Sequence, residues 1–279
     1  MTIEEKQDKL ISILREMSSV AVAFSGGVDS AVVAQAAKLA LGVNAVAITA
    51  HSPSVAQRER EDAERIAQQI GIRHVVIETQ EFSIPAYLVN DGSRCYHCKT
   101  ELYEQVLKQA PVLNIQQVVS GANLDDLGDY RPGLQAAQEH GVRHPLQEAG
   151  CTKADVREMA KHWKLPIWDK PASPCLSSRL VPGLPVTTER LQRIEAAESY
   201  LRSLGLVEFR VRLHEGELAR IEVSAEDIAT LSEPAHRQAL TDHLLQLGFR
   251  FVTLDLQGFR TGSMNQLITL ETKQRFQRT

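Results

Sequence analysis

Several features that mark common protein classes are scarce or missing in this chain. It has 4 cysteines in 279 residues, too few for the disulfide framework of a secreted protein, which favours a reducing, cytoplasmic setting. An apolar run of about 18 residues, the length that a membrane-spanning helix needs, does not occur. The first residues are polar and acidic, unlike a signal peptide. We therefore expect a cytoplasmic protein with no membrane partner.

An excess of positive charge is also missing. The formal net charge is −4, whereas nucleic-acid binding normally requires a basic surface. In residues 185–279, 12 Lys and Arg face 13 Asp and Glu, and no basic stripe is present. We therefore expect no nucleic-acid partner.

The most informative segment that is present runs from Ala23 to Ser30, with the sequence Ala-Phe-Ser-Gly-Gly-Val-Asp-Ser. An apolar run at 20–24 precedes it, and an apolar-periodic stretch at 31–41 follows it. The pattern predicts a turn between a buried parallel strand and a helix. Such a turn presents backbone N–H groups and the positive end of a helix dipole, which suits a phosphate or pyrophosphate.

The residue types in this turn fit a phosphate site. Gly26 and Gly27 allow close approach of the backbone, and Ser25 and Ser30 supply hydroxyl groups. Asp29 is out of place beside an anion unless it helps to hold Mg²⁺ on the phosphates. The alternative is an ordinary Gly-rich turn, with Asp29 as a charge at the helix N-terminus. The lysine of a Walker-type loop is missing, which disfavours kinase or GTPase chemistry.

Strand-like and helical patterns alternate along the first part of the chain. The expected strands are 20–24, 43–50, 74–78 and 117–121, and the helices between them include 54–71 and 98–109. This order predicts an α/β fold with a doubly wound parallel sheet, whose ligand site lies at the carboxyl ends of the strands. His51 follows the second strand, where it is placed to reach adenine or phosphate. Asp125, Asp126 and Asp129 follow the fourth strand and are candidates for magnesium or ribose contacts, with a solvated acidic loop as the alternative.

The pattern changes after a proline-rich passage. Five prolines lie between 166 and 185, and they predict the end of the first domain. A helix at 189–204, strands at 208–214 and 218–223, a helix at 235–247 and a strand at 250–256 then predict a smaller C-terminal α+β domain. We therefore expect domains at 1–182 and 185–279.

The cysteines suggest a second kind of chemistry. Cys95 and Cys98 form a Cys-x-x-Cys pair just ahead of an expected helix, and Cys175 lies in Pro-Cys-Leu-Ser-Ser-Arg at 174–179. A lone Cys-x-x-Cys pair fits half of a zinc site, a dithiol redox pair or part of an iron–sulfur cluster. A second close pair for zinc is missing, and a thioredoxin-like dithiol belongs to a different fold. Cys151 precedes the predicted helix N-cap at residue 152 and is interpreted as a bystander thiol.

Nearly the whole chain resembles one family, the PP-loop ATP-dependent sulfur transferases that make the pincer ligand of the nickel cofactor of lactate racemase. The matching motifs are Ser25–Ser30, Gly121–Gly133, Pro174–Arg179, 210–214, 219–222 and 248–256. The resemblance implies a PP-loop (adenine nucleotide alpha-hydrolase-like) fold that uses ATP and Mg²⁺. Its implied substrate is pyridinium-3,5-biscarboxylic acid mononucleotide, whose carboxylates are adenylated and become thiocarboxylates. A homo-oligomer built through the C-terminal domain is implied as well.

The resemblance also assigns roles to residues. The residues implied to bind ATP are Ala23, Ser25, Gly26, Gly27, Asp29, Ser30, His51, Gly121, Asp125 and Arg131. Asp29 and Asp129 are the implied magnesium ligands, and Asp29 and Cys175 the implied catalytic residues. Those implied to bind the substrate are Ser178, Arg179, Arg210 and Arg212.

The chemistry of the guanidinium group fits the substrate-binding role that the resemblance implies for the arginines. Planar guanidinium groups match phosphate and carboxylate, and Arg210 and Arg212 lie two apart on a strand, so they face the same side. The alternative is that they pair with Glu222 or Glu208 on a solvated sheet face.

The family has two versions of the sulfur-transfer chemistry. In one, the cysteine at the place of Cys175 gives up its own sulfur and becomes dehydroalanine, and those members lack the Cys-x-x-Cys pair. In the other, three cysteines bind a [4Fe-4S] cluster whose free iron carries a sulfide. Because this chain has Cys95 and Cys98, it resembles the second version, with Cys175 as the third ligand. Two rivals stay open: a tRNA thiolase of the same superfamily, and an ATP-binding module of the universal-stress type that needs no cysteines.

Overall fold

A computed structural model describes residues 1–127, 131–260 and 262–276 of the chain. They form two compact units. The first unit comprises Met1–Glu81, Cys95–Ser173 and the residues from Gln274 onward, and the second comprises Phe82–Arg94 and Pro174–Lys273. The segment 82–94 and residues 174–182, which the sequence pattern assigns to the first domain, thus belong to the second unit.

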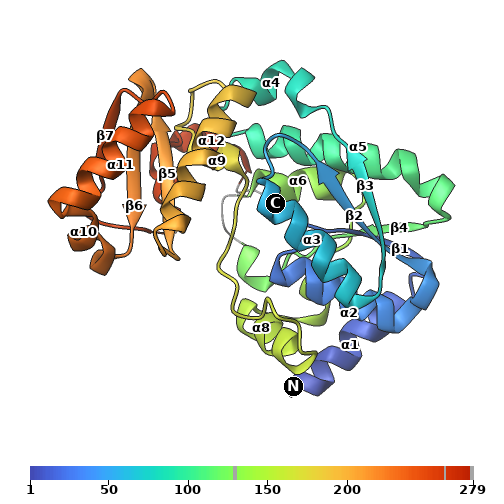
Figure 1. The fold of residues 1–279 in the computed structure, drawn as a ribbon. Coiled ribbons are helices and arrows are strands. Elements are labelled where there is room, and N and C mark those ends of the chain that lie inside the picture. Colours follow the sequence, from blue (N-terminus) through green and yellow to red (C-terminus); the bar gives the residue numbers. More distant parts are fainter. Residues whose placement is uncertain (128–130, 261, 277–279) are drawn as a thin grey trace. The chain divides into compact units, whose positions relative to one another are not determined.

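A parallel sheet forms the centre of the first unit (Figure 1). Its strand order is β3-β2-β1-β4, with the bounds β1 Val20–Ala23, β2 Ala45–His51, β3 Arg73–Glu78 and β4 Gln117–Val119. In the register of the sheet, Val20 lies opposite Ala45 of β2 and Gln117 of β4. The expected parallel α/β sheet is confirmed. Because all four strands run the same way, their carboxyl ends meet at one edge.

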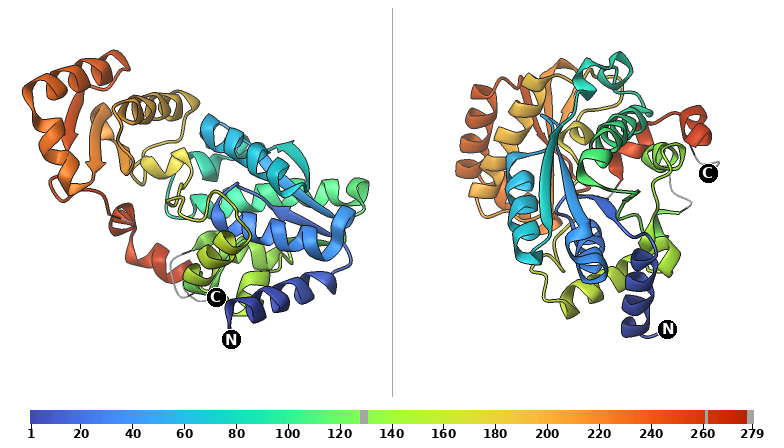
Figure 2. Two further views of the ribbon diagram at one scale, coloured as in Figure 1. Left: turned by 60° about the horizontal axis from the view of Figure 1, so that its bottom comes forward. Right: turned by 90° about the vertical axis from the view of Figure 1, so that its right-hand side faces the viewer.

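Helices cover both faces of this sheet, as the two views in Figure 2 also show. Val20 and Val22 share a core with α1 (Ile3–Arg15), α2 (Val28–Leu41), α3 (Gln57–Ile70), α7 (Pro145–Ala149) and α8 (Lys153–His162). On the opposite face, Ala21 shares a core with α5 (Arg94–Leu113) and α6 (Pro132–Glu139). Successive residues of β1 therefore face opposite layers. This arrangement confirms the doubly wound fold class.

The helix that carries the Cys-x-x-Cys pair begins earlier than the sequence pattern predicts. The expected helix at 98–109 leaves Cys95 ahead of it, but α5 begins at Arg94 and includes both cysteines among its first five residues. Asp91 accounts for the early start. Its side chain accepts a hydrogen bond from Ser93 N at 2.7 Å, and its carbonyl accepts one from Arg94 N at 3.2 Å. This turn opens directly into the helix.

The second unit is built on the sheet β5-β6-β7. Strand β5 (Phe209–His214) pairs antiparallel with β6 (Leu218–Val223), and β7 (Phe251–Leu254) pairs parallel with β6. Its helices are α4 (Pro85–Leu88), α9 (Thr188–Ser203), α10 (Ala225–Ser232) and α11 (Pro234–Gln246), and α12 (Leu270–Phe276) continues from it. The pattern predicts one helix between β6 and β7, whereas the structure has two. Pro234 separates them, because it holds Glu233 in an extended conformation with ψ 142°.

Short 3-10 helices connect these elements at Gly42–Asn44, Glu81–Ser83, Leu124–Asp126, Leu176–Arg179, Glu215–Glu217 and Ser263–Leu267. Over the described ranges, each helix is too short or too polar to cross a membrane.

Candidate active site

The turn between β1 and α2 folds back on itself through its serines. Ser25 N donates to Ser30 Oγ at 3.2 Å, and Ser30 Oγ donates to the carbonyl of Gly27 at 3.0 Å. Gly27 is the N-cap residue of α2 and provides no side chain to cap it. The first N–H groups of α2 therefore point out of the turn without a capping side chain, which is the arrangement that binds a phosphate.

Two glycines are required by close packing around the turn. Gly26 has φ +70°, and a Cβ built there would lie 2.7 Å from the Cα of Ala63 in α3. A Cβ on Gly121, which follows β4, would lie 2.7 Å from the backbone nitrogen of Ser30. The structure thus brings Gly121 against the turn, as expected for a residue of the same site.

Asp29 lies in the first turn of α2 and is held by two different donors. Its Oδ1 accepts a hydrogen bond from Asn123 Nδ2 at 3.1 Å, and its Oδ2 forms an ion pair with Lys153 Nζ at 2.5 Å. Lys153 is the first residue of α8, and its backbone nitrogen donates to Asp125 Oδ2 at 2.7 Å. Asp29 and Asp125 are therefore brought together around the start of α8.

The acidic segment after β4 is ordered by its own capping interactions. Asn123 Oδ1 accepts from Asp125 N at 2.9 Å, and Asp126 Oδ2 accepts from Asn123 N at 2.9 Å. Asp126 also pairs with Arg131 at 2.8 Å. Asp125 is exposed and Asp126 is half-buried, so these contacts order the segment while Asp125 stays open to solvent. Asp129 lies outside the described residues.

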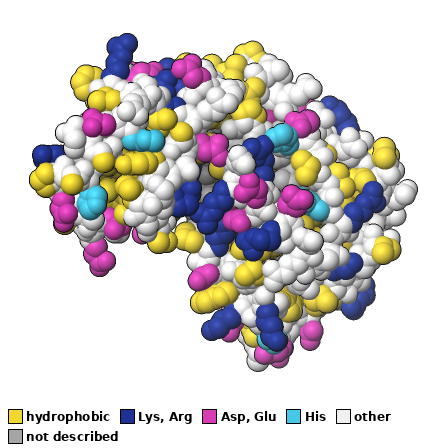
Figure 3. Space-filling model, in the orientation of Figure 1, with side chains coloured by type: hydrophobic (Ala, Val, Ile, Leu, Met, Phe, Trp, Pro, Cys, Tyr) yellow, Lys and Arg dark blue, Asp and Glu magenta, His cyan; other side chains and the backbone are white. Residues whose placement is uncertain are grey.

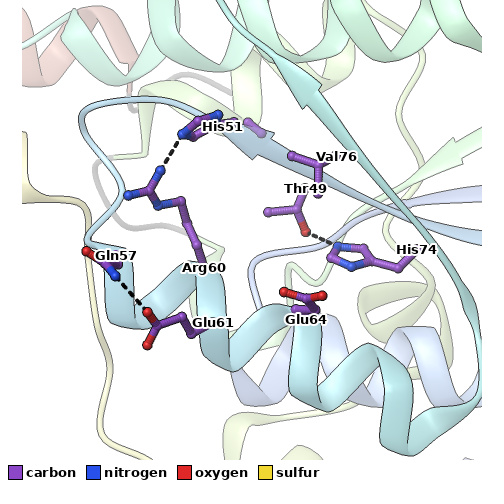
Figure 4. A pocket seen from close by; sticks show the side chains of 9 residues that line it. Thr49, His51, Gln57, Arg60, Glu61, Glu64, His74 and Val76 are labelled. Carbon is purple, nitrogen blue, oxygen red and sulfur yellow. Dashed lines mark hydrogen bonds between the residues drawn. The ribbon is translucent and has the colours of Figure 1, made fainter.

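A pocket of about 350 Å³ opens between β2, β3 and α3 (Figure 4). His51 lies in its wall, with Nδ1 2.7 Å from Glu78 Oε1 and Nε2 in contact with Arg60 Nη1. Arginine only donates, so Nε2 is the acceptor and Nδ1–H donates to Glu78. His51 thus holds Arg60 in a fixed orientation in the pocket. Nearby, burial lowers the pKa of His74, which hydrogen-bonds Thr49 at 2.8 Å.

In the second unit, Arg179 organises the segment around Cys175. Its Nε and Nη2 donate to the two carboxylate oxygens of Glu198 at 2.9 and 3.1 Å. Its Nη1 donates to the carbonyls of Pro174 and Cys175 and to Ser178 Oγ. Arg179 is 3% exposed, so this network fixes the backbone on both sides of the Cys175 thiol.

Arg212 forms a second buried pair. Its Nε and Nη2 donate to Glu222 Oε2 at 3.0 and 2.8 Å, and its Nη1 donates to the carbonyl of Ser178 at 3.2 Å. Glu222 is the partner that the sequence raises as an alternative, but the pair lies inside the unit rather than on a solvated face. Burial and the neighbouring Arg179 and Arg212 lower the pKa of Arg210 to about 10.

The four cysteines lie in different environments. Cys95 and Cys98 lie among the first five residues of α5, three residues apart and so on one face of the helix. Cys175 is the N-cap residue of the 3-10 helix at 176–179 in the second unit. These thiols and Cys151 are not in disulfide bonds. A cluster of three or more His, Cys, Asp or Glu suited to a metal ion is not found within the described part of the chain.

The chain is 37% identical to the pyridinium-3,5-bisthiocarboxylic acid mononucleotide synthase of Lactiplantibacillus plantarum, over 96% of each chain. The chain belongs to the family of this synthase. It is also 46% identical to an uncharacterized protein of Synechocystis sp., over 96% of this chain and 99% of that one. The sequence model of the NAD synthase family matches residues 3–102. A tRNA-specific 2-thiouridylase of Rickettsia rickettsii is 26% identical over 59% of this chain and 55% of that one.

The chain is thus an ATP-dependent sulfurtransferase of the PP-loop type, and ATP and Mg²⁺ are its cofactors. The residues at the turn fit these ligands. The N–H groups at the start of α2 suit the phosphates, and the carboxylate of Asp29 is a hard oxygen ligand of the kind that Mg²⁺ prefers.

Three residues that contact the candidate site residues are not predicted from the sequence: Asn123, Lys153 and Arg60. Asn123 lies inside the matched segment 121–133 but carries no charge that marks it. Lys153 directly follows the predicted N-cap at residue 152. A cation is unfavourable at the start of a helix because the helix dipole repels it, and this unusual placement is a signal that could have identified Lys153. Arg60 gives no signal, because it lies in a helix with charged residues at many positions.

Proposed function

We propose that this sulfurtransferase acts on pyridinium-3,5-biscarboxylic acid mononucleotide. ATP adenylates a carboxylate of the substrate, and sulfur then replaces AMP to give a thiocarboxylate, for the synthesis of a nickel-pincer cofactor. The observation that carries the proposal is the 37% identity with the synthase over 96% of each chain. The phosphate-binding geometry of the β1–α2 turn supports it independently.

The chemistry explains why ATP is needed. A carboxylate is a poor electrophile, whereas an acyl phosphate reacts readily with a thiolate or hydrosulfide. A substrate carboxylate oxygen bonds to the α-phosphorus of ATP, and the bond between that phosphorus and the bridging oxygen breaks. The turn at Ser25–Ser30 holds the phosphates, and Asp29 holds the metal ion on them. Pyrophosphate and then AMP are released.

The arginines of the second unit supply the anion-binding part of the proposal. Substrate phosphate and carboxylates bind at Ser178, Arg179, Arg210 and Arg212. Arg210 is the strongest of these candidates, because it lies beside the positive charges of Arg179 and Arg212, which together with burial lower its pKa to about 10. Arg179 and Arg212 also pair with Glu198 and Glu222, which holds their guanidinium groups in place at the proposed binding surface.

The same proposal assigns the cysteines. Cys95, Cys98 and Cys175 hold a [4Fe-4S] cluster, whose bound sulfide supplies the sulfur. The donor set fits, since three cysteine thiolates are ligands that such a cluster uses and none of the three is in a disulfide bond. A reducing cytoplasm would keep them so. The alternative is that Cys175 donates its own sulfur once. We further propose a closed homo-oligomer.

The test is the reaction itself. Purified protein receives ATP, Mg²⁺, a sulfide source and the pyridinium dicarboxylate, and pyrophosphate and thiocarboxylates are measured by a coupled assay and mass spectrometry. We expect both products from the wild type and neither from Asp29→Ala, which removes the carboxylate at the metal site. Full pyrophosphate production by Asp29→Ala would contradict the assignment of the turn. The absence of thiocarboxylate from an active wild type would contradict the substrate.

tRNA thiolation is a second candidate, because the Rickettsia 2-thiouridylase matches part of the chain. Basic and acidic side chains both occur across the face that Figure 3 shows, and a net charge of −4 gives little attraction to RNA. We expect no shift of bulk tRNA in a gel with this protein. A salt-sensitive shift would favour the second candidate.

A further inference from the structure

The β1–α2 turn has no lysine of its own, but the fold brings one to it. Lys153 comes from α8, 124 residues further along the chain, and its ammonium group contacts Asp29 Oδ2. Asp29 is the carboxylate that the turn offers to a metal ion. The ammonium of Lys153 therefore lies directly at the site where the phosphates of ATP and their metal ion are expected to bind.

The position of Lys153 is unfavourable for its own helix. It is the first residue of α8, where the helix dipole repels a cation, and an acidic residue would be the ordinary choice. The helix is capped without it, because Thr152 and Asp155 form a capping box. A local rule broken in this way is more typical of functional sites than of residues selected for stability.

The contact with Asp29 is also of the kind that exchanges readily. The side chain of Lys153 is 35% exposed and that of Asp29 28% exposed. A pair with this much solvent access contributes about 0–1 kcal/mol, less than a divalent ion on the same carboxylate. The site thus has a carboxylate and an ammonium group that attract each other only weakly and are both available to a charged ligand.

We infer that Lys153 is a catalytic residue of the adenylation step, and this inference rests on the proposed function. With Asp29 holding the metal ion, the ammonium group of Lys153 would be released from this carboxylate and would lie beside the phosphates of ATP. As the bond from the α-phosphorus to the bridging oxygen breaks, its electron pair goes to pyrophosphate. Lys153 stays protonated throughout and stabilises the added negative charge on pyrophosphate. No proton is transferred in this step.

The test separates catalysis from binding and from stability. We expect Lys153→Ala to release pyrophosphate about 100-fold more slowly or worse, the usual loss when one group that stabilises transition-state charge is removed. The Kd of ATP with Mg²⁺, measured by calorimetry without the substrate, should change by no more than about threefold, because the turn and the metal ion still bind the phosphates. Methylammonium added to Lys153→Ala should restore part of the rate.

Lys6→Ala is the matched control. Lys6 of α1 forms an ion pair of 2.5 Å with Asp155, which lies in α8 like Lys153. The side chains of Lys6 and Asp155 are 18% and 22% exposed. We expect the pyrophosphate rate of this variant to equal that of the wild type. A Lys153→Ala rate within about twofold of the wild type would overturn the inference. So would an equal loss of rate, ATP affinity and thermal stability that methylammonium does not restore. If the wild type itself does not react with the pyridinium substrate, the proposed function fails instead.

Discussion

The two arginines that lie two residues apart on β5 differ in their surroundings, and this difference could not be predicted from their spacing. Arg212 is 6% exposed and donates to Glu222, which is fully buried. Arg210 has its guanidinium 5.0 Å from the ring centre of Phe259 and has a lowered pKa of about 10. The sequence therefore predicts the location of both side chains, but only the packing shows which one is a structural ion pair.

This difference gives a prediction for the pair. Arg212→Ala should lower the free energy of unfolding by about 2 kcal/mol, because it removes one of the two arginines that pair with the buried carboxylate of Glu222. Arg210→Ala should cost much less stability, since it removes repulsion from Arg179 and Arg212. It should instead raise the KM for the pyridinium substrate more than the KM for ATP. Denaturant titrations and steady-state kinetics of both variants check this, and equal KM effects on the two ligands would contradict the role of Arg210.

Cys151 gives a prediction about pH. Burial and the charge of Asp155 raise the pKa of its thiol from 9.0 to about 11. In the unfolded chain the thiol ionises near pH 9, while the folded protein keeps its proton until about pH 11. The stability from this group is therefore complete below pH 9 and is lost as the pH rises through that window. Each pKa unit corresponds to about 1.4 kcal/mol.

Cys151→Ala should remove this alkaline loss. Denaturant titrations at pH 8 and pH 10.5 should show a smaller decrease for the variant than for the wild type. Its pyrophosphate and thiocarboxylate rates should equal those of the wild type, because the thiol is fully buried and lies outside the proposed cluster. An identical pH slope in both proteins would contradict the environment assigned to this cysteine.

At the scale of elements, the sequence predicts the first unit well where patterns are strong. The four strands have apolar residues at their centres, and Thr152 is correctly predicted as the N-cap of α8. Helix α1 is not predicted, although Thr2 and Glu5 form a capping box, because its first residues are polar and acidic. The segment 82–94 is assigned to the wrong unit, since its contacts are with residues far along the chain: Asn90 donates to the carbonyls of Val181 and Leu184. Long-range contacts of this kind have no local signal.

The start of α8 gives a prediction at this scale. Thr152 Oγ1 accepts a hydrogen bond from Asp155 N at 3.3 Å, and Asp155 accepts one from Thr152 N at 2.8 Å. Thr152→Ala removes the first of these and should lower the free energy of unfolding by about 1 kcal/mol. Thr152→Ser keeps the hydroxyl and should stay close to the wild type. Equal stability of the alanine variant would show that the capping box does not hold the helix.

At the scale of the whole molecule, the proposed transfer of sulfur to the substrate depends on three cysteines. Cys95 and Cys98 belong to the first unit and Cys175 belongs to the second. The sequence predicts the three cysteines by resemblance, because a Cys-x-x-Cys pair has no role in the sacrificial route. Residues 95 and 175 are 80 positions apart in the chain, and no local pattern links them.

The most direct test counts the thiocarboxylates that each protein molecule makes. Anaerobically reconstituted protein is mixed with ATP, Mg²⁺, sulfide and the pyridinium substrate, and the protein mass is measured before and after turnover. The account predicts a brown protein that makes several thiocarboxylates per chain while Cys175 keeps its sulfur. Replacing Cys95, Cys98 or Cys175 by Ala should remove the colour and stop the transfer. A colourless protein that makes at most one thiocarboxylate per chain, and whose mass falls by the elements of H₂S at Cys175, would contradict it.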